Sequence, residues 1–322
     1  HVREVGVDRL VEVGDAALGL ELFGDAVLRQ EHLPERDLEV AHLGDLDRVL
    51  TRLGRGGERL VTLLGASHVE LVGAVTHQAL EVDGRARTAP AQPLVALMLA
   101  VCGCPVVLHG GDRMPTKYGL PLIDTWQALG INWTGLPLTA IQDIFEQTKL
   151  GYLHLPDHFP QAQSLVPYRE QIGKRPPQAT LELMWCPYAG DCQVIVGYVH
   201  PPPEGLAKGT LAAFVVSNFI TVKGLEGSPD LPRARAAIIG LHAPNSEERL
   251  VLHARDYGVG DKRETPLKPE STYLETLQNT LAGKPTYLQA IALWNGGFYL
   301  WRSGVTSSLA DGIDKARNLL DS

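Results

Sequence analysis

A glycine-rich turn behind an apolar run contains the residues best suited to chemistry. Residues 105–108 read Pro-Val-Val-Leu, and an uninterrupted apolar run of this length predicts a strand that is covered on both faces. His109, Gly110 and Gly111 follow directly. Glycine adopts positive φ at little cost and has no Cβ, so such a turn lets main-chain N–H groups approach a bound ligand. In α/β proteins, ligands bind at turns that follow strands of this kind.

Two cationic side chains and a predicted helix come next. Arg113, Thr116 and Lys117 lie within a few residues of the glycines, and apolar residues at helical spacing predict a helix over 122–129 that Gly130 ends. A helix N-terminus supplies unpaired N–H donors and a partial positive charge, so the stretch predicts a phosphate-binding site. The alternative is an ordinary connection with solvated charges, because the turn matches neither the P-loop nor the dinucleotide-binding fingerprint.

Composition limits the class of protein. A chain of 322 residues with 44% hydrophobic residues is long enough for one large or two ordinary domains with a real core. The net charge of -8 argues against a general nucleic-acid binder, although a local basic groove stays open. Cys102, Cys104, Cys186 and Cys192 are too few and too irregularly spaced for a disulfide framework or a paired zinc motif, which fits a reducing cytoplasm.

Residues 89–108 contain no charged side chain and approach the length of a membrane span. The prolines and the glycine within the run divide it into a helix over 94–99 and the strand described above, so we interpret it as buried core. No signal-peptide pattern precedes the run, and we expect a cytoplasmic protein.

Residues 1–85 differ in composition from the rest of the chain. They contain no Lys, Asn, Ile, Tyr, Trp, Met or Cys, and nearly all are types that G- or C-initiated codons encode. One hypothesis is that a GC-rich gene is read here in a shifted or opposite frame, which resequencing of the coding DNA tests. The alternative is a genuine helical subdomain of biased composition.

The remaining apolar patterns predict alternating helices and strands. They predict an α/β fold in which helices flank a mixed central sheet, with a small N-terminal region that is nominally helical. We expect this region to cover 1–82 and the α/β domain to cover 83–322. We expect helices over 138–149, 272–281 and 309–320, and a short strand that breaks into a proline-punctuated loop within 151–160. We also expect β-rich runs over 194–199, 212–216 and 236–241, an apolar segment over 287–294, and a turn at Asn295-Gly296-Gly297.

Three further groups of side chains are candidates for a site. His158 lies in a proline-punctuated loop, where it either binds substrate or has a structural role. Glu226 and Asp230 lie in a glycine-flanked loop that either suits Mg²⁺ or is simply a turn. Arg85 and Arg87 could face an anion, but solvated side chains are the default expectation.

Taken in order, these motifs resemble the anthranilate phosphoribosyltransferase family over roughly residues 83–322. The segments His109-Gly110 and Thr116-Lys117-Tyr118-Gly119 are similar to the family loop that contacts phosphoribosyl pyrophosphate. Residues 151–160 are similar to a second family segment. Arg169 lies four residues before Gly173, as does the arginine that approaches anthranilate in the family.

The resemblance implies a function and a set of site residues. The family displaces pyrophosphate from phosphoribosyl pyrophosphate with an aromatic amine such as anthranilate. This implies a Mg²⁺-dependent glycosyltransferase of tryptophan biosynthesis that is cytoplasmic and homodimeric. Arg169 would pair with the acceptor carboxylate, His158 would contact the acceptor, and Glu226 and Asp230 would hold Mg²⁺. The implied phosphoribosyl pyrophosphate site comprises Asp83, Gly84, His109, Gly110, Gly111, Arg113, Thr116 and Lys117.

Departures from the family pattern leave other functions open. The family's first glycine loop is reduced here to Asp83-Gly84, and its Asn-Ile-Ser-Thr motif is replaced around residues 90–93. A non-catalytic paralogue would keep the fold and bind single-stranded nucleic acid or another polyanion, with a steep dependence on salt. A nucleoside phosphorylase, which shares the fold, is a third alternative. The cationic cleft for the paralogue would comprise Arg85, Arg87, Arg113, Lys117, Lys174 and Arg175.

Overall fold

The structure is a computed structural model that describes most of the chain from residue 75 onward. Apart from 75–79, the expected N-terminal region over 1–82 lies outside the described residues, so its helical character stays a prediction. The described residues are 75–79, 85–115, 117–174, 179, 182–184, 187–188, 192–213, 216, 218–267 and 269–321.

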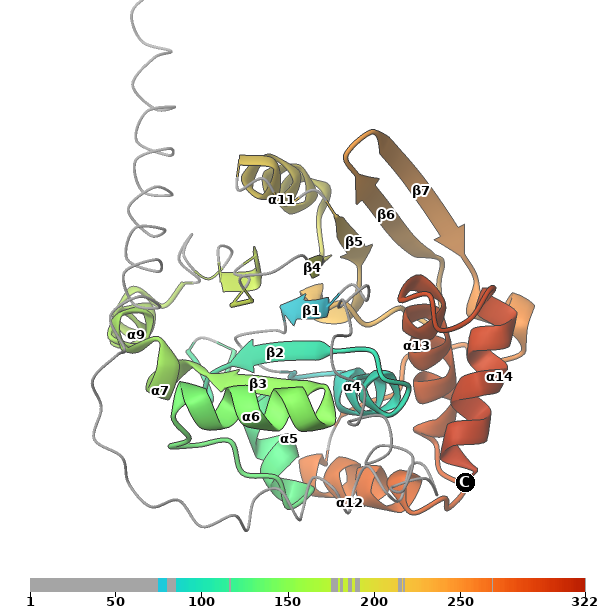
Figure 1. Cartoon of the computed structure of the whole chain (residues 1–322), viewed down its shortest axis with the longest axis horizontal. Helices are drawn as coiled ribbons and strands as arrows, with labels where there is room; N and C mark the ends of the chain where they lie inside the picture. The colour runs from blue at the N-terminus through green and yellow to red at the C-terminus, as the bar shows by residue number, and fades with distance from the viewer. Residues whose placement is uncertain are drawn as a thin grey trace, which may run out of the picture.

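A mixed sheet of seven strands forms the centre of the described chain, in the order β3-β2-β1-β4-β5-β6-β7. The strands from β3 to β5 in this order are parallel, whereas β6 and β7 form an antiparallel hairpin on β5. This confirms the predicted mixed α/β fold (Figure 1). The strands are β1 (Val75–Ala79), β2 (Val106–Gly110), β3 (Leu150–His154), β4 (Cys192–Tyr198), β5 (Phe219–Lys223), β6 (Ala237–Ala243) and β7 (Ser246–Leu252).

Strand β1 lies in the middle of this sheet and pairs with β2 and β4. The sheet therefore begins before residue 83, where we expected the α/β domain to start. Strand β7 is the last strand in this order and is therefore an edge strand. Its first four residues are exposed.

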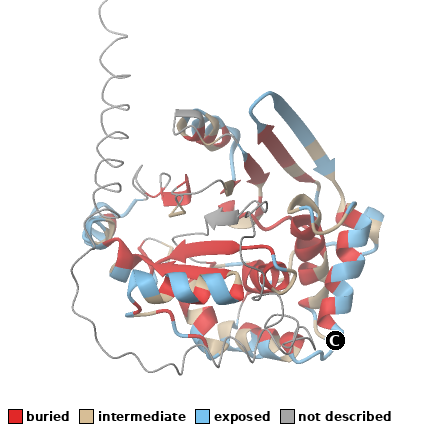
Figure 2. Ribbon diagram, in the orientation of Figure 1, coloured by how far each residue is buried: buried red, intermediate tan, exposed pale blue. Residues whose placement is uncertain are grey.

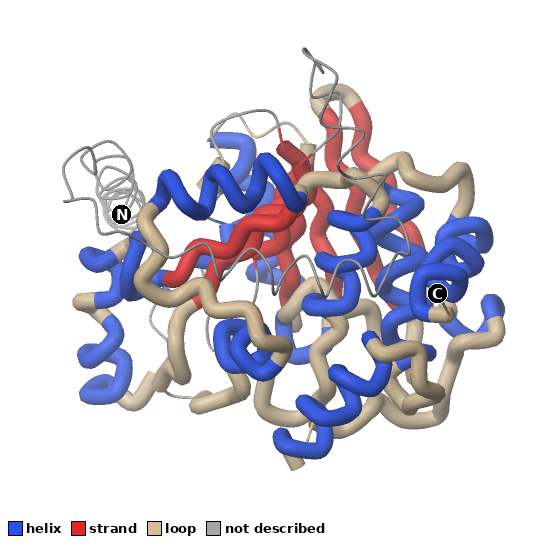
Figure 3. The backbone as a smooth tube through the Cα atoms, turned by 60° about the horizontal axis from the view of Figure 1, so that its bottom comes forward, coloured by secondary structure: helices blue, strands red, loops and turns tan. Residues whose placement is uncertain are grey.

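Helices surround the sheet (Figure 3). The predicted helices over 138–149, 272–281 and 309–320 are confirmed by α6, α12 and α14, with shifts of at most two residues at their ends. The α-helices are α4 (Gln92–Val101), α5 (Leu122–Ala128), α6 (Leu138–Thr148), α7 (Leu155–His158), α8 (Pro160–Gln163), α9 (Val166–Ile172), α11 (Pro201–Ala213), α12 (Glu270–Leu281), α13 (Gln289–Arg302) and α14 (Leu309–Leu320). The 3-10 turns are η1 (Glu182–Met184), η2 (Leu225–Gly227) and η3 (Ala254–Tyr257).

Strand β2 is buried on both faces, as its continuous apolar sequence predicts. Val106 and Leu108 belong to one hydrophobic cluster, whereas Val107 belongs to a second. Successive side chains of a strand point to opposite faces, so the two clusters lie on the two sides of the sheet. The end of β2 is thereby fixed from both sides, and the loop that follows starts from a rigid point.

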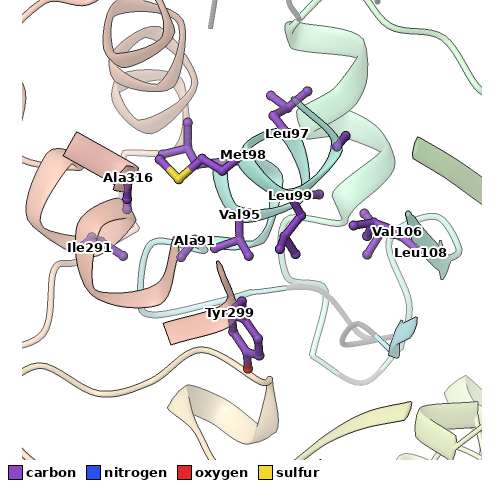
Figure 4. Close-up of a cluster of buried hydrophobic side chains, with 14 of the residues drawn as sticks. Ala91, Val95, Leu97, Met98, Leu99, Val106, Leu108, Ile291, Tyr299 and Ala316 are labelled. Atoms are coloured by element: carbon purple, nitrogen blue, oxygen red, sulfur yellow. The ribbon is translucent and has the colours of Figure 1, made fainter. Parts of the chain in front are cut away.

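Helix α4 is the most deeply buried helix element around this strand. All its residues from Gln92 to Ala100 are buried, and its side chains meet those of β2, α13 and α14 (Figures 2 and 4). The uncharged run over 89–108 is thus a core helix followed by a core strand, as expected. Among the described residues, no helix combines the length and the apolar character that a membrane crossing needs.

Two sequence-based predictions of secondary structure are wrong. The apolar run expected as a strand over 212–216 begins inside the last turn of α11, and β5 starts only at Phe219. Short apolar runs do not distinguish a strand from the end of a helix. The proline-punctuated segment after β3 forms the short helices α7 and α8 in place of a loop.

The turn expected at Asn295-Gly296-Gly297 is also wrong, because these residues lie inside α13. The glycines allow α13 and α14 to approach closely. A Cβ at Gly312 of α14 would lie 2.2 Å from the carbonyl oxygen of Gly297. Asn295 is fully buried and accepts a hydrogen bond of 2.7 Å from the Leu231 N–H. Glycine therefore marks helix packing here, and not a change of chain direction.

A close main-chain contact seats the turn η2 on the sheet. A Cβ at Gly197 in β4 would lie 2.1 Å from the Gly227 carbonyl oxygen and 2.3 Å from the Ser228 carbonyl carbon. Both atoms belong to the main chain, which cannot swing aside as a flexible side chain does. Glycine at position 197 therefore fixes how closely η2 approaches β4.

We predict that Gly197→Ala lowers the free energy of unfolding by about 2 kcal/mol or more, because the added methyl group overpacks a main-chain contact. Chemical denaturation measures this. The matched control is Gly205→Ala in α11, where an added Cβ meets nothing within 4 Å. That control should gain roughly 0.5–1 kcal/mol from higher helix propensity. Equal effects of the two variants would contradict the packing argument.

Candidate functional site

Three loops that follow parallel strands meet at one edge of the sheet. Residues 85–88 come after β1, residues 111–118 after β2, and residues 224–230 after β5. The carboxyl ends of parallel strands lie at the same edge, which is where open α/β sheets bind ligands. The carboxylate of Glu226, in η2, contacts both other loops.

The Glu226 carboxylate accepts hydrogen bonds from three consecutive main-chain N–H groups. Those of Ala86, Arg87 and Thr88 lie 3.3, 3.0 and 2.8 Å from its oxygens, and the Thr88 hydroxyl donates at 2.8 Å. Successive N–H groups that point at one centre form a main-chain anion-binding site. Glu226 itself has a φ of 57°, in the left-handed region that non-glycine residues occupy rarely. The carboxylate is therefore held at a cost in backbone strain.

Two cations complete this arrangement. Lys117 Nζ lies 3.2 Å from one oxygen of Glu226, and Arg85 Nε lies 3.6 Å from the other. The side chain of Glu226 is 4% exposed, and burial alone would raise its pKa. Arg85 and Lys117, together with the Thr88 hydroxyl, instead lower the pKa of Glu226 to about 2. We call Glu226, Arg85, Thr88, Lys117 and the N–H groups of residues 86–88 the Glu226 cluster.

Asp230 is a second buried carboxylate beside the cluster. Its Oδ2 lies 3.0 Å from Arg85 Nη1 and accepts a hydrogen bond of 3.0 Å from the Ala91 N–H. Burial raises the pKa of Asp230, and Arg85 and the Ala91 N–H oppose that shift. Arg85 is 3% exposed, so the expectation of a solvated side chain was wrong. The side chain of Arg87, which is 81% exposed, is solvated as expected.

The predicted Mg²⁺ site at Glu226 and Asp230 does not fit this arrangement. The guanidinium of Arg85 contacts both carboxylates, so a fixed positive charge already stands where the ion would have to bind. Mg²⁺ requires oxygen ligands in near-octahedral geometry and usually keeps several waters. Here the carboxylate oxygens instead face N–H and hydroxyl donors. The described residues contain no group of three or more side chains suited to a metal ion.

The glycines after β2 serve close packing. Neither Gly110 nor Gly111 has a positive φ, so the loop does not use the left-handed backbone that glycine allows. A Cβ at Gly110 would lie 2.9 Å from the hydroxyl oxygen of Tyr152, and one at Gly111 would lie 2.4 Å from Met114 Cε. His109 precedes them at the end of β2 and is 1% exposed. The missing Cβ atoms thus let the loop after β2 lie tightly against β3.

His154, at the end of β3, links the loop after β2 to helix α7 after β3 through two carboxylates. Its Nε2 lies 3.1 Å from Asp112 Oδ1 and its Nδ1 lies 2.7 Å from Asp157 Oδ2. Burial would raise the pKa of Asp157, but the Gly135 N–H and His154 lower it. Sequence reasoning missed His154, because one of its carboxylate partners, Asp112, becomes a neighbour only when β2 and β3 pair.

The two cations predicted after the glycine turn have different partners. Arg113 Nη2 lies 2.7 Å from Glu270 and 3.2 Å from Asp124, and its side chain is 40% exposed. Lys117 contacts Glu226. The structure therefore brings Lys117 into the Glu226 cluster and places Arg113 against carboxylates of α5 and α12.

The two predicted acceptor-binding residues are buried. His158 ends helix α7, and its ring nitrogens lie 3.0 and 3.1 Å from the carbonyl oxygens of His154 and Leu136. Arg169 is 1% exposed and forms an ion pair with Glu182, which is 0% exposed. In this arrangement both side chains are engaged within the protein. Their contact with an acceptor stays a prediction that requires them to rearrange.

Four other predicted residues lie outside the described residues: Asp83, Gly84, Thr116 and Arg175. Lys174, predicted for a cationic cleft, is exposed at the end of the segment after α9. The donors that sequence reasoning missed are the Thr88 hydroxyl and the N–H groups of residues 86–88. Main-chain N–H groups carry no signal in a sequence, since only the backbone conformation makes them converge.

Comparison with known sequences gives one matching family model and several named relatives. The family model described as "Glycosyl transferase family, a/b domain" matches residues 83–322. The chain is 28% identical over 225 residues to an anthranilate phosphoribosyltransferase of Paracidovorax citrulli, and 26% identical over 228 residues to that of Albidiferax ferrireducens. These alignments cover 69% of this chain, but only 64% and 63% of the relatives. The chain thus matches less than two thirds of the length of these relatives.

Solved structures share the fold at lower identity. Anthranilate phosphoribosyltransferase from Thermus thermophilus superposes with a TM-score of 0.60 at 17% identity, covering 94% of each chain. The enzyme from Saccharomyces cerevisiae in complex with PRPP and Mg superposes with a TM-score of 0.65 at 13% identity, covering 95% of this chain and 88% of the other. At such identities the similarity establishes the fold alone.

We predict that Glu226→Gln destabilises the protein by about 3 kcal/mol at neutral pH, since the pKa falls from 4.5 to about 2 on folding. A lowered pKa gives stability that is complete above pH 4.5 and is lost as the pH falls towards 2. The difference between wild type and variant should therefore shrink over that range, measured by urea denaturation at several pH values. Glu270→Gln, which breaks an exposed pair with Arg113, should cost less than about 1 kcal/mol.

For the buried pair, we predict that Arg169→Ala lowers the free energy of unfolding by about 3–5 kcal/mol, because the Glu182 carboxylate is left buried without its cation. The double variant Arg169→Met/Glu182→Leu removes both charges and should recover most of that loss. Thermal and urea denaturation of both variants give the comparison. A stable Arg169→Ala protein that is impaired only towards an acceptor would contradict the structural role.

Proposed function

Because the chain belongs to the glycosyl transferase family, whose a/b domain spans residues 83–322, we propose that it transfers phosphoribosyl groups. The donor would be phosphoribosyl pyrophosphate and the acceptor an aromatic amine such as anthranilate, with release of pyrophosphate. The curated relatives named anthranilate phosphoribosyltransferase support this proposal, as does the yeast structure with PRPP. The corresponding place in metabolism is tryptophan biosynthesis.

The Glu226 cluster is the observation that carries the proposal. Three main-chain N–H groups, the Thr88 hydroxyl and the Lys117 ammonium all point at one small anionic group at the carboxyl edge of the sheet. A phosphate oxygen needs the same donors as a carboxylate oxygen. In the proposed complex, oxygens of the donor's diphosphate take the place of the Glu226 carboxylate.

The position of these donors suits the negative charge that develops during the proposed reaction. When pyrophosphate leaves C1 of the ribose, negative charge grows on its oxygens. Donors that are fixed before the reaction stabilise this charge without reorganising, and one such donor is typically worth about 3 kcal/mol. The main-chain N–H groups of residues 86–88 are fixed by the backbone, and Lys117 adds a full positive charge. The chemistry needs no protein nucleophile.

Other parts of the proposal rest on the relatives or on the sequence. Mg²⁺ accompanies PRPP in the yeast structure, whereas Glu226 and Asp230 as placed here do not form a site for the ion. Mg²⁺ dependence therefore has to be measured for this chain. A homodimer and a cytoplasmic location stay predictions.

The alternatives do not gain support from the comparisons. The relatives reported above carry the name of a phosphoribosyltransferase, which points away from a nucleic-acid-binding paralogue. Three members of the predicted cationic cleft, Arg85, Arg113 and Lys117, are paired with carboxylates of the protein. Phosphorolysis of a pyrimidine nucleoside would reveal the third alternative, a nucleoside phosphorylase.

We predict that isothermal titration detects binding of phosphoribosyl pyrophosphate, and that Lys117→Ala weakens it about tenfold or more, because a charged hydrogen bond to phosphate is lost. The titration is run with and without Mg²⁺. The matched control is Lys315→Ala, which removes an exposed lysine of α14. The same proteins are then assayed for consumption of anthranilate.

Three results would overturn the proposal. Absence of binding with and without Mg²⁺ would show that phosphoribosyl pyrophosphate is not the donor. Equal binding by wild type and Lys117→Ala would move the donor away from the Glu226 cluster. Binding without any anthranilate consumption would leave a donor-binding protein that is not this enzyme.

A further inference from the structure

A concave site separate from the Glu226 cluster lies at the open end of the β6–β7 hairpin. Its volume is about 690 Å³, within the range of small-molecule sites. Residues before β6 and residues in and after η3 form its walls. It shares no lining residue with the Glu226 cluster. The charged or titratable residues of its lining are Arg233, Arg235, Arg255, Lys262, Asp261 and His253.

Two of its arginines are anchored to main-chain carbonyls. Arg233 Nε donates to the Val259 carbonyl at 2.6 Å, and Arg235 Nη2 donates to the Gly224 carbonyl at 3.2 Å. A guanidinium has five N–H donors, so bonds of this kind fix its orientation and leave donors for a ligand. The positive charge of both side chains is thereby held in place before a ligand arrives.

The other two cations of this pocket are weakly engaged. Lys262 has no ion-pair partner among the residues that the structure describes. Arg255 Nε lies 3.7 Å from Asp256, and both side chains are more than half exposed, which makes this pair weak. Asp261 is the one carboxylate in the lining, and its Oδ2 lies 3.8 Å from Arg233. Positive charge is therefore in excess inside the pocket, although the chain as a whole carries a net charge of -8.

The neutral part of the lining indicates the kind of ligand. It consists of Ala234, Ala236, Ala254 and Gly260, which leave room but provide little apolar surface. The only ring among the described lining residues is the imidazole of His253, so there is no aromatic platform on which a nucleobase would stack. Charge, and not apolar contact, would have to supply the affinity.

We propose that this pocket binds a compact oligophosphate, such as inorganic pyrophosphate or tripolyphosphate. Two anchored guanidiniums and two weakly engaged cations around one concavity match several phosphate groups held close together. The backbone between residues 224 and 235 links the pocket to the Glu226 cluster, but the binding claim is independent of the proposed transfer reaction.

Isothermal titration with inorganic tripolyphosphate tests this on the full chain. Arg235→Gln/Lys262→Gln should weaken binding about tenfold or more, because charged hydrogen bonds to phosphate are lost. Lys117→Ala should retain that binding event. The matched control, Lys315→Gln/Arg317→Gln, removes two exposed cations of α14 and should bind like wild type. Binding should also weaken between 50 and 200 mM NaCl, roughly as screening of exposed charges requires.

Each contrary result overturns the proposal. Unchanged binding by Arg235→Gln/Lys262→Gln would exclude the pocket. Loss of all binding in Lys117→Ala would assign the oligophosphate to the Glu226 cluster. Tighter binding of a short single-stranded oligonucleotide through the same residues would show that the ligand of the pocket is a nucleic acid and not a compact anion. If the double variant does not fold, the single variant Lys262→Gln, at an exposed side chain, gives the same comparison.

Discussion

The Glu226 carboxylate is the interaction on which the carboxyl edge of the sheet depends. Three loops leave that edge after β1, β2 and β5, and the Glu226 carboxylate, in the loop after β5, contacts both others. One ionised group satisfies three main-chain donors, a hydroxyl and two cations at once. Without it, those donors would lie partly buried and without an acceptor. The left-handed backbone at Glu226 shows that this arrangement is favourable enough to outweigh local strain.

The buried arginines Arg85 and Arg169 form ion pairs with carboxylates of the protein, and this limits where an anionic ligand can bind. Arg85 contacts Asp230, and Arg169 contacts Glu182, each in surroundings that exclude water. A ligand can enter such a place only by exchanging with a protein carboxylate. At the Glu226 cluster that exchange is chemically balanced, since one anion replaces another. The pocket beside η3 differs, because carboxylates of the protein neutralise its positive charge only in part.

The sequence alone was sufficient for elements whose signal is local. Continuous apolar residues identified β2, and an amphipathic period identified α14 to the residue. Glycine misled in two ways: Gly296 and Gly297 permit helix packing, and Gly110 permits close contact with Tyr152. The carboxylate partners of Arg85, Glu226 and Asp230, are more than 140 residues away in the chain. Such pairings depend on strand order, which no local pattern contains.

The sheet ends at β7, and its exposed face has a consequence for how the protein behaves at high concentration. An edge strand offers a row of main-chain donors and acceptors to any extended segment that approaches. Glu247, Glu248 and Arg249 are all exposed on β7. A foreign strand would have to strip water from these charges before pairing. The hairpin thus protects the fold against fibril-like stacking.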